Sequence, residues 1–401
     1  MNMFKIRYSY GKVGNDNLGN TRFPYLYDIE TMTKKDGDKT VDTGGYNFGD
    51  YTFDRYYGGM RYSSLSSPNV TWEIATKHDL GIDFSFFNDK LSGSVDYFNE
   101  KREGIYMLRE YLPGIVGLES NPSANVGKVT SEGFDGHFTF RQKLGAVGLT
   151  IRSNITYSKN EIVDRDEENN YYWYKMQKGH RVNQARGLIS LGLFKDYDDI
   201  RNSPVQDFDG YKVMPGDIKY RDIDGDGAIT SEDKVMLSSY GDMPRIQYGL
   251  GLNVRWKKFD FGVFFNGSAK RKIMINSGFA PFLSSGGDGG PAESLPRNLM
   301  SWIAESHWSV DNPNLDALYP RLGTSNADIA GNIQPSSYWM RNGNFLRFKT
   351  LELGYTFPMC RVYFSGDNLA VFSPFKLWDP ELAWNAYPLQ RTFNLGVQFT
   401  F

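Results

Sequence analysis

The chain has 401 residues, of which 40% are hydrophobic and 15% are aromatic, and its formal net charge at pH 7 is −2. A net charge this close to zero leaves no basic footprint for nucleic acid, and a single cysteine, Cys360, excludes a framework of intramolecular disulfides. No stretch approaches the roughly 18 uninterrupted apolar residues that a membrane-spanning helix needs.

The predicted elements are β-strands in which apolar and polar residues alternate, so that each face of a strand receives one kind of side chain. The strands come in pairs joined by very short turns, with long polar segments between the pairs. The pattern predicts about twelve strands, of which the pair over 171–176 and 188–194 is the weakest. In chain order they cover 4–10, 72–86, 91–98, 133–141, 147–157, 171–176, 188–194, 246–256, 259–265, 345–357, 361–372 and 393–401.

The last strand alternates without a miss to the final residue, Phe401. Soluble proteins seldom end on an apolar strand, because its exposed edge would pair with other chains. Bacterial outer-membrane barrels do end this way, since closure removes the edge and lipid takes the apolar face. We therefore predict an all-β fold, an antiparallel transmembrane β-barrel with long extracellular loops, and interpret Phe401 as its assembly signal.

The orientation of the barrel follows from its turns. Outer-membrane barrels keep short turns on the periplasmic side and long loops outside the cell. If the last strand ends at the periplasm, all five predicted short turns fall on that side. The long segments, including 195–244 and 266–343, are then extracellular loops. The others are 11–71, 99–130, 158–170 and 373–391.

Several short motifs occur in an order and at spacings that resemble the SusC/RagA family of TonB-linked outer-membrane transporters from Bacteroidetes. They extend over the whole chain; each alone is weak, and together they are specific. The matching stretches are Lys5 to Gly11 with Gly14-Asn15, Thr71-Trp72-Glu73, Leu91 to Tyr97, Asn125 to Lys128 with Gly133-Phe134, Pro215 to Tyr220 leading into Asp222 to Gly227, Phe345 to Arg347, Gly354-Tyr355 and Ser365 to Leu369.

The resemblance implies import of an oligosaccharide or oligopeptide nutrient across the cell outer membrane by binding and gated passage. It also implies a SusD-like surface lipoprotein as partner, and TonB, which contacts a part of the family's chains that we do not find. Family members are longer, with a signal peptide, a plug domain and a barrel of about 22 strands. We expect residues 1–401 to be the C-terminal part of such a barrel, without the plug, the signal peptide and the first strands. A complete small passive porin stays open as an alternative.

The most specific chemical motif runs from Asp222 to Asp233 and follows the pattern of a calcium loop. Carboxylates occupy positions 1, 3 and 5, glycine position 6, and the last position holds Asp where helix-loop-helix sensors use Glu, as in the dockerin variety. Converging carboxylates repel one another unless a hard cation neutralises them. We expect Ca²⁺, with a solvated Asp- and Gly-rich turn as the alternative. The candidate ligands are Asp222, Asp224, Asp226, Ala228, Thr230 and Asp233.

Aromatic residues of segment 266–343 are candidates for contact with cargo, because aromatic planes stack on sugar rings or on apolar peptide side chains. The sequence favours the alternative that they pack the loop against itself or form an interfacial girdle. Girdle positions are also expected for Trp72 and Trp256, and Arg141, Arg152, Arg255 and Arg347 are expected on the polar strand faces. The cargo candidates are Trp302, Trp308, Tyr338 and Trp339.

No enzyme motif is present in the sequence: neither a G-x-S-x-G elbow, a P-loop, an H-E-x-x-H helix nor a dinucleotide fingerprint occurs. We therefore expect a transporter wall and no catalytic residues. Two alternatives from other classes remain. A passive porin would conduct in a bilayer by itself. A secreted calcium-dependent β-rich binding protein would stay in the aqueous phase on detergent partitioning.

Overall fold

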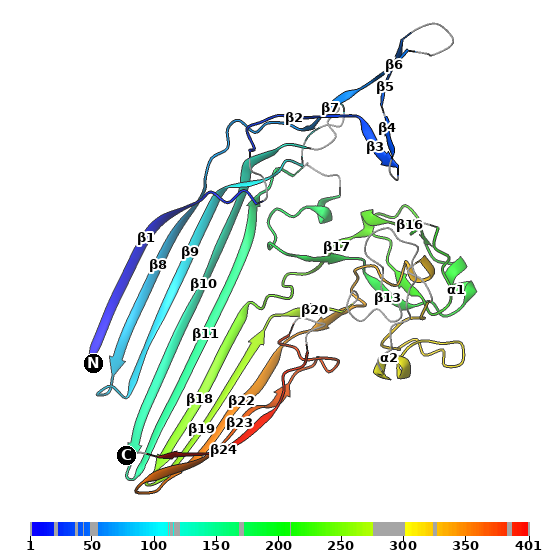
Figure 1. Ribbon diagram of the computed structural model, residues 1–401. Helices are drawn as coiled ribbons and strands as arrows, with labels where there is room; N and C mark the ends of the chain where they lie inside the picture. The colour runs from blue at the N-terminus through cyan, green and yellow to red at the C-terminus, as the bar shows by residue number, and fades with distance from the viewer. Residues whose placement is uncertain are drawn as a thin grey trace.

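A single antiparallel sheet of ten strands dominates the fold (Figure 1). The computed structural model describes residues 2–19, 23–36, 39–42, 44–48, 55–110, 112, 115, 121–167, 172–208, 210–275, 301–323, 327–382 and 387–399. The strands follow one another around the sheet in chain order, as in a meander. They are β1 (Met3–Asn15), β8 (Glu73–Phe86), β9 (Leu91–Leu108), β10 (Ser123–Leu144), β11 (Val147–Asp164), β18 (Ile246–Trp256), β19 (Phe259–Ala269), β22 (Phe345–Thr356), β23 (Cys360–Phe372) and β24 (Thr392–Phe399).

Ten of the predicted strands are confirmed, each at or near its expected place. The pair over 171–176 and 188–194 is wrong: the first segment contains the 3-10 helix η2 (Trp173–Lys175), and the second contains β13 (Ser190–Leu193), which lies outside the large sheet. In this second segment Leu188, Leu193 and Phe194 are buried, whereas Leu191 is 54% exposed. The buried residues pack in the interior of the long connections and do not form one face of a membrane strand. Phe401 lies outside the described residues.

The short turns gather at one end of the sheet, near the start of β1 and the end of β24, and the long connections leave the other end (Figure 1). Four predicted turns are confirmed between paired strands, and residues in the left-handed region make three of them tight: Asn88 at φ 55°, Gly145 at φ 61° and Lys257 at φ 51°. The fifth, around Gly179, lies in a long connection. The four confirmed turns thus all lie at the same end of the sheet, as predicted.

One face of the sheet is apolar across its width. Val254 of β18 pairs with Leu149 on one side and with Phe261 on the other. The row continues through Leu353, which pairs with Phe261 and with Phe364. Among the described residues no element packs over this face, and Leu353 keeps 45% of its surface exposed. An apolar face without a covering layer is what a lipid-facing sheet presents.

The opposite face carries ion pairs that cross the strands. Arg7 of β1 reaches over Gly81 of β8, and its guanidinium lies 2.8 Å from Asp83 and 2.8 Å from Asp96 of β9. A Cβ atom at Gly81 would lie 2.1 Å from the Asp96 carboxylate and 2.7 Å from the guanidinium carbon, so a side chain there would have to displace the bridge. Cross-strand pairs of opposite charge stabilise a sheet, and they mark this face as the wet one.

Aromatic side chains line the short-turn end of the apolar face. The rings of Trp256 and Phe259 stack at 5.9 Å, and Phe259 meets Tyr355 edge-on at 4.7 Å. Trp256 is 48% exposed and Trp72, beyond the other end of β8, is 63% exposed. Exposed aromatic residues at both ends of the strands match the girdles of membrane proteins at the two lipid interfaces.

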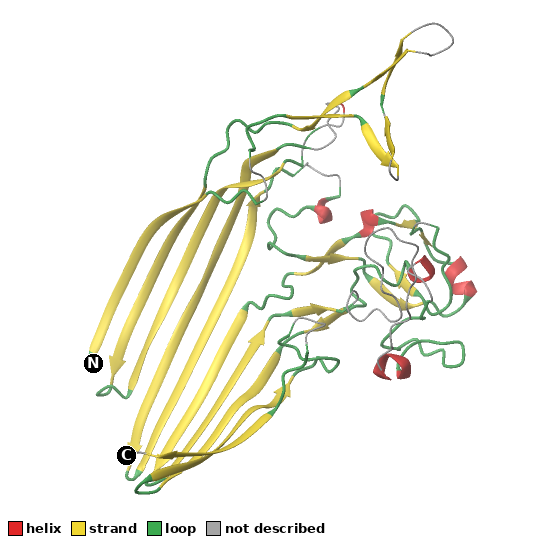
Figure 2. Ribbon diagram, viewed as in Figure 1, coloured by secondary structure: helices red, strands yellow, loops and turns green. Residues whose placement is uncertain are grey.

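The well-packed interior lies outside the sheet, in a unit that we call the cap: the described parts of 172–245, 270–344 and 373–391. Short strands and helices build it beyond the long-loop end of the sheet (Figure 2). Its core consists of buried residues that these connections share, among them Ile218, Tyr220 and Trp339. The elements are β12 (Ala185–Gly187), β13, α1 (Tyr197–Arg201), β14 (Val205–Gln206), β15 (Ile218–Tyr220), β16 (Ala228–Ile229), η3 (Ser231–Asp233), β17 (Val235–Ser238), β20 (Lys272–Met274), α2 (Ser301–Glu305), η4 (Ala327–Ile329) and β21 (Met340–Asn342).

A separate arm of hairpins rises from the connection between β1 and β8 (Figure 1). Its strands pair with one another and not with the large sheet. They are β2 (Asp28–Thr31), β3 (Thr33–Asp36), β4 (Lys39–Asp42), β5 (Gly45–Phe48), β6 (Arg55–Gly58) and β7 (Met60–Ser64). Across the described parts of the chain, no helix has the length and apolar character needed to traverse a bilayer.

Candidate functional site

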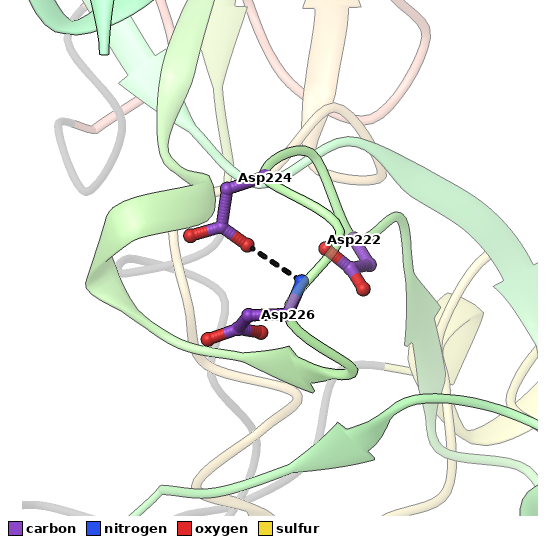
Figure 3. A group of neighbouring side chains, drawn as sticks. All are labelled: Asp222, Asp224 and Asp226. Atoms are coloured by element: carbon purple, nitrogen blue, oxygen red, sulfur yellow. Dashed lines mark hydrogen bonds between the residues drawn. The ribbon is translucent and has the colours of Figure 1, made fainter. Parts of the chain in front are cut away.

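Three carboxylates of the cap converge at the loop that precedes β16. Asp222, Asp224 and Asp226 each offer an oxygen, and these oxygens all lie within 4.8 Å of one another (Figure 3). They come from alternate positions of one tight loop, so the chain itself brings them together. Oxygen donors at this spacing are the ligand type that calcium and magnesium bind.

Backbone conformation and backbone hydrogen bonds give the loop its shape. Gly225 and Gly227 have φ angles of +80° and +85°, which residues with a Cβ rarely adopt. The carboxylate of Asp222 accepts the N–H of Gly225 at 2.6 Å and that of Gly227 at 2.9 Å. Asp224 and Asp226 each accept an N–H two residues ahead, from Asp226 and Ala228. The loop is therefore folded by its own side chains.

The far end of the loop is closed by Asp233, which is fully buried. Its two oxygens accept the N–H groups of Ile223 at 2.6 Å and of Thr230 at 2.8 Å, which ties the two ends of the loop together. The Thr230 hydroxyl accepts the N–H of Glu232 at 3.1 Å and completes a capping box at η3. Asp233 and Thr230 thus serve as loop closures here, and Asp233 lies outside the carboxylate group of Figure 3.

The loop is joined to the cap core through β16. Ile229 has no exposed surface, and β16 pairs in parallel with β14. From β14, the Gln206 side chain donates to the carbonyl of Ile218 at 3.0 Å and accepts the N–H of Tyr220 at 2.9 Å. Any ion that fixes the loop would therefore act on a strand buried in the cap core.

Segment 172–175 lies against the acidic loop. Lys175 forms an ion pair with Glu232. Burial, followed by the negative charge of Asp224, raises the pKa of the Tyr174 phenol to about 12. The same two causes raise the pKa of Tyr172, for which burial is again the largest. The sequence had assigned this segment to a strand, and no periodic signal marks it as a neighbour of the loop.

The aromatic residues predicted as cargo contacts mostly lie inside the cap. Trp308 is 6% exposed and Trp339 is 3% exposed. The indole N–H of Trp339 donates to the Asn332 carbonyl at 2.8 Å, and the Tyr338 hydroxyl donates to the Ala317 carbonyl at 2.7 Å. This burial agrees with the packing alternative that the sequence favoured. Trp302 belongs to α2, and its side chain lies outside the described residues; cargo contact by this set stays a prediction.

A buried ion pair that sequence reasoning missed fastens two long connections together. Asp217 is fully buried, and its carboxylate lies 2.9 Å from Nε of Arg321. Asn332 donates to the same carboxylate at 2.8 Å, and its own amide oxygen accepts the N–H of Ile218 at 2.8 Å. The only available signal was the place of Asp217 in the Pro215 to Tyr220 motif.

Comparison with known proteins identifies the family. Residues 4–369 match the family described as TonB dependent receptor-like, beta-barrel. The chain belongs to this family. Among curated relatives, TonB-dependent receptor P26 of Formosa agariphila is 26% identical over 99% of the chain, and TonB-dependent receptor SusC of Bacteroides thetaiotaomicron is 25% identical over 99%. The chain covers 40% and 37% of their respective lengths.

Solved structures show the same fold. A structure of the RagAB peptide importer in an open-open state matches this TonB-dependent receptor chain with a TM-score of 0.66 at 19% identity. The match covers 99% of this chain and 40% of the RagAB chain. Another, titled as the RagAB peptide transporter, gives a TM-score of 0.64 at 20% identity. The SusC/RagA resemblance, the transmembrane β-barrel fold class and the outer-membrane location predicted from sequence are confirmed.

All four predicted arginines lie on the polar face of this receptor wall, and in the part of the chain that the structure describes three of them are not enclosed by acidic residues. Arg141 faces Thr150, Arg152 faces Gly251, and Arg255 faces Gly148 across neighbouring strands. Arg347 differs, because it is 1% exposed and enclosed by acidic residues of the connection between β23 and β24. The sequence placed Arg347 on the right face and did not foresee its burial.

Proposed function

We propose that this chain is the barrel wall of an importer that captures an oligosaccharide or oligopeptide outside the cell and admits it by gated passage. The observation that carries the proposal is the difference between the two faces of the sheet. One face is apolar and uncovered among the described residues, and the other carries cross-strand ion pairs. Membership of the TonB-dependent receptor family supports this use of the two faces.

The cap and the hairpin arm supply the surface that cargo meets first. Both leave the sheet at the end opposite the short turns (Figure 2), which is the extracellular end in outer-membrane barrels. A cap with its own core keeps a fixed shape above the wall, so recognition does not require a loop to fold around each cargo molecule. The mechanism needs no bond chemistry, and we assign no catalytic residue.

The partners are inferred from the relatives. The RagAB structure is that of a peptide importer, and the relative SusC is named a TonB-dependent receptor. We propose a SusD-like surface lipoprotein as the extracellular partner. We assign the TonB contact to the part of the relatives' length that this chain does not cover.

Uptake by cells tests the import proposal. Cells that produce the complete transporter should accumulate labelled oligosaccharides or oligopeptides, and removal of the proton-motive force should stop the accumulation. Loss of uptake only when the chain is deleted, with energy dependence, supports gated import. Uptake that continues without the proton-motive force, together with steady conductance in bilayers, would identify a passive porin instead. Recovery of the protein from the aqueous phase after detergent partitioning would refute both membrane functions.

We also propose that Asp222, Asp224 and Asp226 bind Ca²⁺. The donor set fits the ion, because all three offer hard carboxylate oxygens and the tight loop already holds them together. Ala228, Thr230 and Asp233 are the further ligands that the sequence pattern assigns, and their role stays a prediction. The ion would stiffen the segment 195–244 by relieving the repulsion of the three carboxylates.

Terbium luminescence tests the calcium proposal. Tb³⁺ occupies calcium sites, and the neighbouring phenols of Tyr172 and Tyr174 would transfer excitation to it. We expect sensitised emission that Ca²⁺ displaces, and its loss in the variant Asp224→Asn. The variant Asp316→Asn, which changes an exposed carboxylate of the cap outside the loop, is the control. Equal emission from both variants would reject the site.

A further inference from the structure

A cavity of about 330 Å³ lies on the polar side of the wall, where the connection between β23 and β24 folds back over the sheet. The β23 residues Ala370 and Val371 form part of its lining, together with Leu389, which is 44% exposed. Its remaining lining residues are polar or charged: Arg347, Asn368, Asp379 and Arg391. Its size is at the lower end of the range for small-molecule sites, about 300–1,000 Å³.

An irregularity in the sheet shapes this cavity. The pairing of β22 with β23 shifts between Phe348 and Thr350, so both strands bulge at this level. Asn368 takes a left-handed conformation at φ 54° in the bulge. Its side-chain amide donates to the carbonyls of Leu389 at 2.8 Å and Gln390 at 3.2 Å. Bulges re-aim side chains and are frequent beside functional sites; this one fastens the returning connection over the cavity.

Arg347 holds the other side of the connection. Its guanidinium lies 2.5 Å from Asp379 and 2.8 Å from Glu381, and it also donates to the side-chain oxygen of Asn368. One guanidinium between two carboxylates leaves this group with a net charge of −1. Arg347 is almost fully buried, so the group is a fixed part of the wall and not a surface pair.

Arg391 supplies the opposite charge. It lines the same cavity and is exposed. Within the described residues no carboxylate forms an ion pair with it. The cavity therefore carries an unpaired cation at Arg391 and a net negative group around Asp379. A neutral sugar would use neither charge, whereas a molecule with both an ammonium and a carboxylate would use both.

We propose that this cavity is a subsite for a small zwitterion, a free amino acid or dipeptide. Its carboxylate binds the Arg391 guanidinium, and its ammonium group binds beside Asp379. The inference deepens the proposed import function and rests on it for the source of the ligand. It favours peptide over neutral oligosaccharide as the cargo class.

Binding of dialanine to the purified complete transporter tests the subsite. Calorimetry compares dialanine with N-acetyl-dialanine and with dialanine amide, which lack one charge each. We expect each capped form to bind at least about tenfold more weakly, the loss typical of one charge-assisted contact. The variant Arg391→Gln should weaken dialanine to the level of its amide, and Arg391→Lys should restore part of the affinity. Arg255→Gln changes an exposed arginine of the same polar face at the short-turn end and is the control.

Dialanine binding that is equal in Arg391→Gln and in the unchanged protein would overturn the subsite, as would capped forms that bind as tightly as dialanine. An absence of dialanine binding would also overturn it. None of these outcomes affects the import proposal, because energy-dependent uptake is measured separately with intact cells. Conversely, a protein that binds dialanine at Arg391 but takes up no cargo would leave the subsite standing and the import function refuted.

Discussion

The carboxylate of Asp217 has no exposed surface, and its charge is balanced entirely inside the cap. Arg321 and Asn332 reach it from the connection between β19 and β22, more than 100 positions along the chain. The N–H of Met214 donates to the same group at 2.8 Å. One side chain thus joins two connections that the sequence separates, and breaking such a pair exposes an uncompensated charge to a poorly solvated interior.

We expect the variant Asp217→Asn to loosen the cap by about 3 kcal/mol, at the low end for a broken buried pair, since Arg321 keeps some exposure to water. Hydrogen exchange measures this locally. Protection of the amides of Ile218 and Trp339 should fall by roughly a factor of 100. The control Asp198→Asn removes an exposed pair with Arg201 and should leave protection unchanged. Equal protection in both variants would show that the Asp217 ion pair does not hold the two connections together.

Asp199 makes the cap sensitive to acid. A hydrogen bond from Lys219, at 2.7 Å, is the main cause that lowers the pKa of Asp199. A lowered pKa means that the group stabilises the fold above its unfolded value of about 3.9 and that this contribution is lost as the pH falls through the folded pKa. We therefore expect the thermal unfolding temperature of the cap to fall between roughly pH 6 and roughly pH 2, the range that contains this protonation. Lys219→Met should flatten the profile, and a profile identical to the unchanged protein's would contradict this assignment.

At the scale of the element, the strands could be predicted where lipid and water act on opposite faces. Alternation then has to be strict, as it is in β18, because each residue meets either hydrocarbon or water. The strands β9, β10 and β11 are longer than predicted. The prediction stopped short because the additional residues lie where lipid and water no longer act on opposite faces, so their side chains do not alternate. There the ladder continues with ion pairs such as Arg102 with Glu73, which alternation does not reveal.

The cap could not be predicted in the same way, because its partners are distant in sequence. β13 pairs with β15, and β20 pairs with β21 across a connection of more than 60 residues. The acidic loop was found because its side chains fold their own backbone, so its pattern is local. The aromatic residues around Trp339 were ambiguous, because the sequence of a long loop does not say whether it packs on itself.

A glycine fixes the packing of the segment before β15. Gly216 has φ +85°, and a Cβ there would meet the ring of Trp308 at 2.1 Å. We expect Gly216→Ala to destabilise the cap by more than the roughly 1–2 kcal/mol of the left-handed backbone alone, because the buried ring must move as well. Gly210→Ala isolates the backbone cost, since Gly210 has φ +76° and open space around it. Chemical denaturation followed by tryptophan fluorescence compares the two. Equal losses would mean that the Trp308 contact is not limiting.

At the scale of the whole molecule, two kinds of apolar surface coexist in one chain. The cap buries its apolar residues among themselves, as a soluble domain does, while the sheet leaves a band such as Leu250, Leu353 and Leu395 uncovered. Both edges of the sheet, β1 and β24, are unpaired within the described residues. Unpaired strand edges are costly in lipid, and this chain spans 40% and 37% of the lengths of two curated relatives.

The two faces of β18 allow a direct test of where the lipid lies. Leu252 belongs to the apolar band, between Ile151 and Val263, while the next residue, Asn253, points to the polar side. An arginine in the lipid-facing band costs about 2–4 kcal/mol near the bilayer midplane. We therefore expect Leu252→Arg to lower the free energy of unfolding of the complete barrel in phospholipid vesicles by that amount. Asn253→Arg, one residue away on the wet face, should change it little. If the two substitutions cost the same, hydrocarbon does not contact this face, and the assignment of the sheet as a membrane wall fails.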